Sequence, residues 1–211
     1  MKSIGYVDRT QSLRQQVALS QAKLELGCGD RKRDASAIGV DLRDFPCVDV
    51  LGDVFDVLVS LPDDSVSNVY ASHFIEHVEN LDELMSSLGR VVKPGGVIEF
   101  IVPHFSNPYF YSDITHKTFF GLYSFCYLAK SSIFRREVPD YGLRFNFVLD
   151  SVDLVFKSGR PFYGRHLFKK IAGKLVNIST YSKEFYEENL TWLVPCYEVR
   201  YVIRCRASET D

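Results

Sequence analysis

The sequence predicts an α/β fold, in which a mostly parallel sheet carries helices on both faces. Apolar runs alternate with segments of helical periodicity through the first half of the chain. Residues 97–102 are almost entirely apolar, as expected of a parallel strand that is buried on both faces. An earlier strand ends at Gly27 and Gly29, where the missing side chains let a ligand approach the backbone. We therefore expect a ligand site at the carboxyl ends of the parallel strands.

Composition narrows the class of protein. A chain of 211 residues with 46% hydrophobic and 25% charged residues is ordinary for one soluble globular domain. The formal net charge of −2 gives no reason to expect a nucleic-acid partner. The five cysteines include no CxxC pair, which argues against a disulfide framework or a zinc knuckle and favours a reducing, cytoplasmic setting. Neither a signal peptide nor a membrane span is indicated.

The predicted elements begin with a short helix within residues 10–20. Strands are predicted at residues 22–26, 37–41, 48–51, 66–72, 97–102, 145–157 and 197–205. The second of these strands ends at an acid, Asp41, which is placed to accept hydrogen bonds from a ribose diol. Residues 61–65 form a turn before the fourth strand.

A longer helix is predicted to start at Asn80, because Glu83 lies three residues further on, as in a capping box. Apolar residues recur at helical spacing as far as Val92. Pro94 and the two glycines after it are expected to end this helix.

The second half of the chain has a different character. Residues 104–130 are rich in aromatic side chains and are expected to form a loop on the substrate side of the sheet. Residues 160–193 are expected to form a helical insertion. We expect residues 1–211 to make up a single domain.

Five segments follow one another along the first half of the chain: LELGCG (24–29), VD (40–41), GD (52–53), ASHFIEHV (71–78) and LGRVVKPGG (88–96). Together they resemble the class I S-adenosylmethionine-dependent methyltransferases over about residues 22–105. Further on, DITH (113–116) followed by Phe119 and Phe120 is similar to a type 11-like subgroup of uncharacterised bacterial proteins with a short first helix, some of them linked to surface polysaccharides.

The resemblance implies a Rossmann-like, seven-stranded sheet whose last strand runs antiparallel to the rest. It implies that the glycine loop faces the cofactor, that Glu25 lies near the amino-acid end and that Asp41 binds the ribose hydroxyls. Asp53 and Val54 would lie at the adenine, with Ser72 and His73 at the mouth of the fourth strand. The expected cofactor-binding residues are Glu25, Gly27, Cys28, Gly29, Asp41, Leu42, Asp53, Val54, Ser72 and His73.

The cofactor favoured over NAD is S-adenosyl-L-methionine. A dinucleotide site has a third glycine and a long helix after it, but Lys32 occupies that position. Asp30 suits a cationic sulfonium, although the neighbouring basic residues 31–33 weaken this argument. Only ten residues separate Gly29 from Val40, which leaves no room for a full crossover helix. We therefore expect a more open pocket, or one closed by another segment such as residues 1–20.

Methyl transfer depends mainly on alignment, and a base is needed only where the acceptor is a hydroxyl. His104, Asp113 and His116 are the candidate catalytic residues, because they follow a strand at the carboxyl edge of the sheet. They could equally be a buried hydrogen-bonded set that holds the loop. Metal binding by these residues is a less favoured alternative, and we predict no metal site. Glu76 and His77 are expected to order the start of a helix, despite a spacing from His73 that is compatible with metal ligands.

Residues 157–174 contain six Lys or Arg and no acid. They are interpreted as a solvated helix face, with contact to a membrane surface or a lipid-linked substrate as the alternative.

The sequence thus predicts a methyltransferase that acts on an oxygen or nitrogen of a small-molecule or glycan-like acceptor. A non-catalytic module that binds a nucleoside cofactor, or another α/β nucleotide-dependent enzyme, remains as an alternative.

Overall fold

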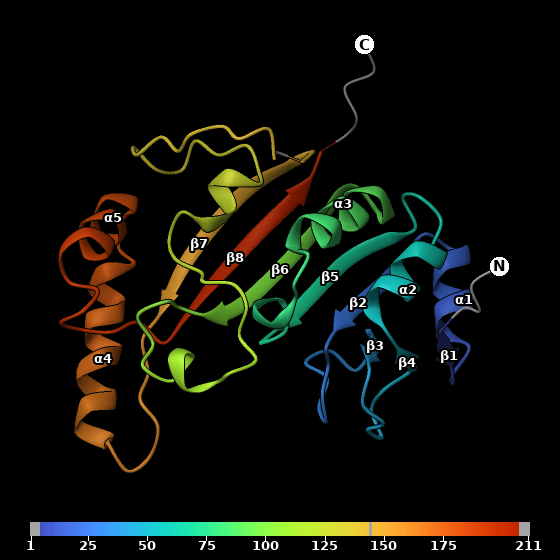
Figure 1. The fold of residues 1–211 in the computed structure, drawn as a ribbon, viewed down its shortest axis with the longest axis horizontal. Coiled ribbons are helices and arrows are strands. Elements are labelled where there is room, and N and C mark those ends of the chain that lie inside the picture. The colour runs from blue at the N-terminus through green and yellow to red at the C-terminus, as the bar shows by residue number, and fades with distance from the viewer. Residues whose placement is uncertain (1–4, 144, 207–211) are drawn as a thin grey trace.

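The computed structural model describes residues 5–143 and 145–206, which form helices around one sheet (Figure 1). In the described residues the sheet has eight strands in the order β1-β4-β3-β2-β5-β6-β8-β7. The strands are β1 (Tyr6–Asp8), β2 (Ala22–Leu26), β3 (Ile38–Asp41), β4 (Val50–Gly52), β5 (Val66–Ser72), β6 (Val92–Pro103), β7 (Phe147–Val155) and β8 (Glu198–Cys205). The α-helices are α1 (Ser12–Ala18), α2 (Val54–Ser60), α3 (Leu81–Val91), α4 (Tyr163–Val176) and α5 (Thr180–Asn189).

Strands β4, β3, β2, β5 and β6 run parallel to one another, and β8 runs antiparallel between β6 and β7. The mixed, mostly parallel sheet and its antiparallel last strand confirm the predicted fold class. The prediction of seven strands omitted β1, which pairs antiparallel with β4 at the edge. Three residues with no apolar alternation leave too little periodicity for sequence reasoning to detect such a strand.

The register of the central strands determines where the polar residues lie. Leu26, the last residue of β2, is paired with Val40 on one side and with Ala71 on the other. The residues that follow these three positions therefore emerge side by side at the carboxyl edge of the sheet. They are Gly27, Asp41 and Ser72.

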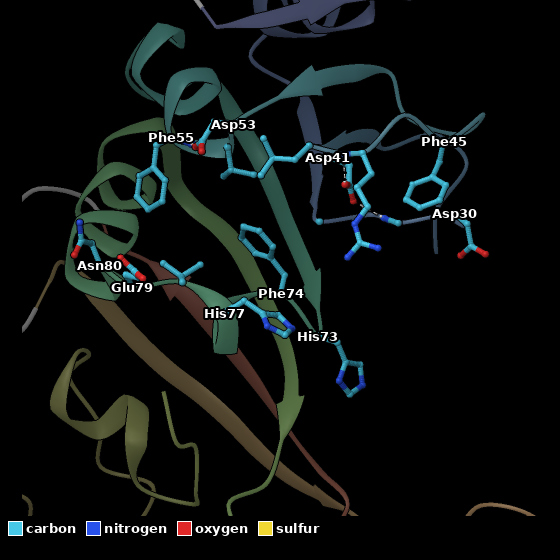
Figure 2. Close-up of a pocket in the computed structure, with 16 residues that line it drawn as sticks. Asp30, Asp41, Phe45, Asp53, Phe55, His73, Phe74, His77, Glu79 and Asn80 are labelled. Carbon is cyan, nitrogen blue, oxygen red and sulfur yellow. Dashed lines mark hydrogen bonds between the residues drawn. The ribbon is translucent and has the colours of Figure 1, made fainter. Parts of the chain in front are cut away.

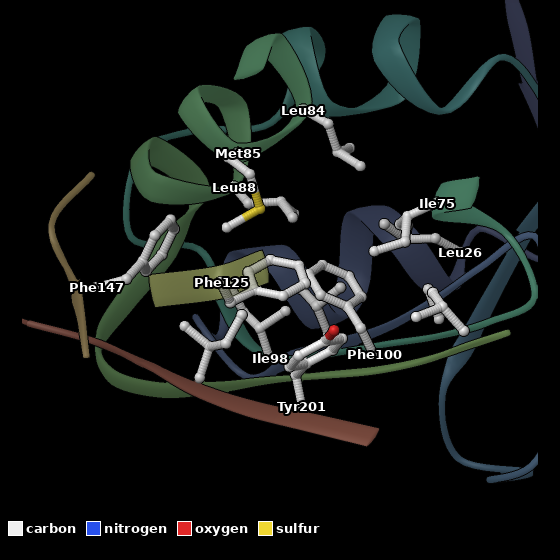
Figure 3. Packing of buried hydrophobic residues seen from close by; sticks show 14 of the residues in the cluster. Leu26, Ile75, Leu84, Met85, Leu88, Ile98, Phe100, Phe125, Phe147 and Tyr201 are labelled. Atoms are coloured by element: carbon white, nitrogen blue, oxygen red, sulfur yellow. The ribbon is translucent and has the colours of Figure 1, made fainter. Parts of the chain in front are cut away.

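Helices α2 and α3 lie side by side over one face of the sheet (Figure 1). Leu84, Met85 and Leu88 of α3 are fully buried and point towards β6 and β8 (Figure 3). Below them Phe100 of β6 stacks on Phe125, with ring centroids 5.5 Å apart. This interface forms the centre of the hydrophobic core.

Helix α3 begins after Asn80, as predicted, but the capping box is not formed. The Asn80 side chain caps no backbone N–H and instead donates a hydrogen bond of 3.2 Å to Glu83. Strand β6 starts at Val92, earlier than the predicted residue 97, because a bulge accommodates Pro94 and the glycines after it. Sequence analysis also missed α2, whose first turn is capped by Asp53 accepting from the Phe55 N–H.

Helices were expected on both faces of the sheet, but the connection between β2 and β3 places no helix on the second face of the central strands. No helix forms between β2 and β3, as the short connection predicted. Tyr70 of β5 and Glu99 of β6 alternate with core residues and therefore point to this second face. Arg33 from the connection covers them, with a 2.6 Å ion pair to Glu99 and its guanidinium 4.5 Å from the Tyr70 ring centroid. A polar layer thus replaces a helix in this region.

Within the described part of the chain, no helix is both long and apolar enough to cross a membrane.

Replacing Phe100 with alanine should lower the free energy of unfolding by about 3–5 kcal/mol, because the fully buried ring leaves a cavity. Chemical denaturation measures the loss. Phe168→Ala is the matched control, since Phe168 is 59% exposed and its loss should stay within about 0.5 kcal/mol of wild type. Equal losses in the two variants would contradict this description of the core.

Candidate active site

A cavity of about 790 Å³ lies at the carboxyl edge of the sheet, where four consecutive parallel strands end. Figure 2 shows Asp41 and Phe45 on one side of it, and His77, Glu79 and Asn80 on the other. The lining residues are Gly27, Gly29, Asp30, Asp41, Leu42, Arg43, Phe45, Asp53, Val54, Phe55, His73, Phe74, His77, Val78, Glu79 and Asn80. This volume lies in the range of small-molecule sites.

The loop after β2 is shaped by its two glycines. Gly27 has φ of 61°, and a Cβ atom there would come within 2.5 Å of the Phe74 ring. Gly29 has φ of 59° and no atom within 4 Å of such a Cβ position. Both positions favour glycine by conformation, and Gly29 also leaves open space beside the cavity.

Asp41 links this loop to the end of β3. Its Oδ2 accepts a hydrogen bond of 2.8 Å from the Gly29 N–H, and its Oδ1 accepts one of 2.8 Å from the Arg43 N–H. Each carboxylate oxygen has two lone pairs, so each keeps one for a ligand in the cavity. The side chain is therefore held in place and still able to accept two hydroxyl hydrogen bonds.

The far end of the cavity is less polar. Asp53 caps α2 through a 2.8 Å hydrogen bond from the Phe55 N–H. Val54 and Phe55, which follow it, line the cavity together with Leu42 and Phe45. One acid among apolar and aromatic walls is suited to a flat heterocycle with a polar edge.

A second pocket of about 450 Å³ adjoins the first and shares Gly27 with it. Glu25, Cys28 and Ser72 line this smaller pocket rather than the larger one. Burial raises the pKa of the Cys28 thiol to about 12, so the thiol is protonated near neutral pH. The predicted cofactor residues are thus divided between two adjoining pockets, with the remaining six and Gly27 in the larger one.

Glu25 holds the short connection between β2 and β3. Its side chain is nearly buried, and both carboxylate oxygens accept from the Arg33 N–H at 2.9 Å. The next residue, Asp34, donates its N–H to the same carboxylate at 3.4 Å. Residues 31–33 line the smaller pocket, whereas none of residues 5–20 lines either pocket. The connection between β2 and β3 therefore itself forms the wall of the smaller pocket on the side where no helix is present.

Two of the three basic residues of this connection are paired, whereas Arg31 is exposed and lines the smaller pocket. Lys32 forms a 2.6 Å ion pair with Asp49 and donates to the Ala37 carbonyl, while Arg33 pairs with Glu99. These contacts direct both charges towards neighbouring strands. They leave neither side chain free to neutralise a pyrophosphate at the glycine loop.

His73 lies at the mouth of β5 in an unusual backbone conformation, with φ of 53°. Its Nε2 is 2.9 Å from Glu198, and its Nδ1 is 3.4 Å from Glu76. The hydrogen bond to Glu198, and then the proximity of Glu76, raise the pKa of His73 to about 9. This residue lines the cavity with both ring nitrogens directed at carboxylates, an arrangement suited to positioning rather than to taking up a proton.

His104 lies away from both pockets. It is fully buried, with Nδ1 2.8 Å from the Ser106 hydroxyl and Nε2 3.0 Å from Glu187 of α5. Both ring nitrogens are therefore engaged inside the core. In this position His104 fastens the end of β6 to α5.

Asp113 and His116 lie together, with 3.7 Å between Oδ2 and Nε2, but they are not grouped with His104. The hydrogen bonds from the Thr115 hydroxyl and backbone hold the pKa of Asp113 below its usual value. The His116 ring instead approaches His77, with centroids 4.9 Å apart, and His77 lines the larger cavity. Sequence reasoning gave His77 only a structural role, because its spacing from His73 and Glu76 does not reveal a partner far along the chain.

Comparison with known proteins places the chain among methyltransferase folds. Residues 31–100 match a family described as a methyltransferase domain. An S-adenosylmethionine-dependent methyltransferase from Archaeoglobus fulgidus is 18% identical, with a TM-score of 0.50 over 91% of this chain and 90% of that one. No curated protein matches the sequence.

A second similar structure is phosphoethanolamine N-methyltransferase 2 of Haemonchus contortus in complex with S-adenosyl-L-methionine. It is 15% identical, with a TM-score of 0.53 over 88% of this chain. The chain spans only 48% of that enzyme. At these identities the two solved structures show a shared fold.

Glu25→Ala should lower the free energy of unfolding by about 1–3 kcal/mol, because the Arg33 and Asp34 N–H groups lose their acceptor. Glu25→Gln keeps one accepting oxygen and should lower the free energy of unfolding by a smaller amount. Denaturant unfolding of both variants measures the difference. If Glu25→Ala were as stable as wild type, the carboxylate would not be what holds the connection.

Proposed function

We propose that this chain is a class I S-adenosylmethionine-dependent methyltransferase and that it methylates an oxygen or nitrogen of a small-molecule or glycan-like acceptor. S-adenosyl-L-methionine is its methyl donor. The observation that best supports the donor site is the position of Asp41, which is fixed by the glycine loop and faces the larger cavity. Its two free lone pairs match the two hydroxyls of a ribose.

The two pockets suggest how the donor lies. With the ribose at Asp41, the adenine would occupy the region of Asp53, Val54 and Phe55. The methionine part would then extend past Gly27 towards the smaller pocket, where Glu25 and Ser72 lie. Glu25 already accepts backbone hydrogen bonds, so its part in donor binding would be mainly to hold the surrounding loop.

Transfer from a sulfonium releases a neutral thioether, which needs no acid. The main task of the chain is therefore to align donor and acceptor. Where the acceptor is a hydroxyl, a base must accept its proton. His104 is fully buried away from the cavity. His116 lies against His77, which lines the cavity, and Asp113 lies 3.7 Å from His116. We therefore retain His116 and Asp113 as the candidate base pair and give His104 a positioning role.

The acceptor would bind on the side of the aromatic loop, residues 104–130. Tyr109, Tyr111 and Phe119 of this loop are more than half exposed. Such rings offer flat apolar surfaces to a sugar or another small molecule. The Haemonchus contortus enzyme of similar fold is a phosphoethanolamine N-methyltransferase, so small amines that carry a phosphate belong in the same acceptor screen as sugars.

The alternatives are less well supported. A nicotinamide enzyme would need positive charge or a helix start at the glycine loop. Of the three basic residues there, Lys32 and Arg33 are paired elsewhere, and Arg31 lines the smaller pocket. No helix follows the loop before β3. A non-catalytic module would bind the donor in the same way and would differ only in lacking turnover.

Asp41→Ala should weaken S-adenosylmethionine binding by roughly 10- to 150-fold, equivalent to losing hydrogen bonds to a charged group worth about 1.5–3 kcal/mol. Isothermal titration calorimetry with the donor, its demethylated product and NAD measures the effect. Asp63→Ala is the control, because Asp63 is exposed and pairs with Arg90 away from the cavity. Unchanged affinity in Asp41→Ala, or preferential binding of NAD, would contradict the proposed donor site.

A peripheral contact with an anionic membrane would bring the enzyme to a lipid-linked acceptor. Helix α4 stands with α5 at the β7 end of the sheet (Figure 1) and presents an exposed apolar stripe. The stripe consists of Leu167, Phe168, Ile171, Leu175 and the neighbouring Ile178, each at least half exposed. Arg165, Lys170 and Lys174 on the same helix are also exposed, and α4 contains no acid. Apolar and basic groups on one helix are typical of interfacial helices.

Replacing both Leu167 and Phe168 with serine should reduce binding to phosphatidylglycerol vesicles at least tenfold, because two exposed apolar anchors are removed. Co-sedimentation at low and high salt measures this binding. The matched control is the double variant Leu19→Ser and Val59→Ser, whose side chains are also exposed but lie outside α4. Absence of wild-type binding to anionic vesicles would remove the membrane proposal and leave the donor site unaffected.

A further inference from the structure

Three potential metal ligands converge beside the larger cavity. Glu76 and His77 belong to η1 (Ile75–His77), and His116 comes from the loop after η2 (Phe110–Ser112). One donor atom from each residue lies within 4.8 Å of the other two. The loop is held against η1 by the backbone, since the Lys117 N–H donates to the Glu76 carbonyl at 2.7 Å.

The Glu76 carboxylate is buried without a hydrogen-bond partner. Its residue is 0% exposed, and neither Oε1 nor Oε2 accepts a hydrogen bond. His73 Nδ1 approaches to 3.4 Å and His77 Nε2 to 4.0 Å, but neither makes a hydrogen bond, and His73 is directed to Glu198 by its other nitrogen. His73 thus gives Glu76 one long ion pair, which it shares with the closer Glu198. A second cation beside the buried carboxylate would lower the cost of burying its charge.

Both histidines carry a proton on Nδ1, so their neutral forms have the lone pair at Nε2. His116 Nδ1 lies 2.9 Å from the Phe110 carbonyl oxygen, which accepts only, so Nδ1 carries the proton. His77 Nδ1 lies 2.9 Å from the Thr115 hydroxyl. That hydroxyl donates its proton to Asp113 at 2.6 Å and therefore accepts from His77. Metal-binding histidines are commonly oriented in this way, with the second ring nitrogen donating to an oxygen.

We propose that Glu76, His77 and His116 bind a divalent transition-metal ion, with Zn²⁺ as the best match to two imidazole nitrogens and one carboxylate. Zn–ligand bonds of about 2.0–2.2 Å place donor atoms roughly 3.4 Å apart, so small side-chain rotations would close the present arrangement. Asp113, whose Oδ2 is 3.7 Å from His116 Nε2, lies close enough to complete the site or to orient its ligands. This proposal departs from the sequence-based expectation of no metal.

The position of the site gives the ion a role. His77 lines the cavity, so a fourth coordination position would be accessible to a ligand there. An acceptor hydroxyl or carboxylate bound to the ion would be oriented, and a hydroxyl would lose its proton more readily. This role rests on the proposed methyl transfer and would replace His116 as the base, because its Nε2 would then hold the ion. The metal site itself does not depend on the proposed methyl transfer.

Calorimetric titration of the EDTA-treated, full-length chain with Zn²⁺ tests the site. One equivalent should bind, and Glu76→Gln and His116→Gln should each weaken binding at least tenfold. His166→Gln is the matched control, because His166 lies in α4 and its Nδ1 contacts Ser158. Addition of Co²⁺ should give wild type the visible absorption bands of a nitrogen–oxygen site, and both site variants should lose them.

Thermal unfolding gives a second measurement that does not depend on activity. Zn²⁺ should raise the melting temperature of wild type and of His166→Gln, but not that of the two site variants. Binding that is unaffected by both site variants, or absent in wild type, would overturn the proposal. The EDTA-treated chain should bind S-adenosylmethionine with the same affinity as the untreated chain. A chain that does not bind Zn²⁺ would therefore contradict the metal site alone, whereas the Asp41→Ala titration tests the donor site.

Discussion

The pairing of β2 with β3 and β5 is the constraint on which the candidate site depends. Because Leu26 is level with Val40 and Ala71, the three strands end together and their following residues meet at one edge. The Gly29 N–H then reaches the Asp41 carboxylate at 2.8 Å without any intervening side chain. A one-residue shift in the register of β2 with β3, or of β2 with β5, would move the side chains of the shifted strand to the opposite face of the sheet. It would also remove this contact.

The short connection between β2 and β3 has consequences on both faces of the sheet. It lacks the helix that usually follows such a loop, so its backbone N–H groups need another acceptor, and Glu25 supplies it. Arg33 of the same connection covers Glu99 and Tyr70, which a helix would otherwise have buried. One buried acid and one arginine thereby close the pocket and make the second face polar.

Buried carboxylates organise the carboxyl edge of the sheet in different ways. Glu198 binds His73 and Lys157, and Glu187 binds His104, so each has partners. Glu76 is more deeply buried and accepts no hydrogen bond; it has only a 3.4 Å ion pair with His73, and one ring nitrogen each of His77 and His116 lies within 4.8 Å of it. Since the interior stabilises ions only through close partners, this difference separates a structural acid from a candidate ligand.

The sequence by itself determined the fold class, the central strands and the ends of β2 and β3, because apolar periodicity, glycines and a terminal acid are local signals. The sequence also showed that the segment between Gly29 and Val40 is too short to contain a crossover helix. Only the tertiary structure decided that His104 is enclosed by α5 and that His77 meets His116. Those contacts join segments far apart in the chain, and their geometry follows from packing and strand register rather than from spacing. The edge strand β1 and the exposed stripe of α4 likewise depend on which surfaces their neighbours cover.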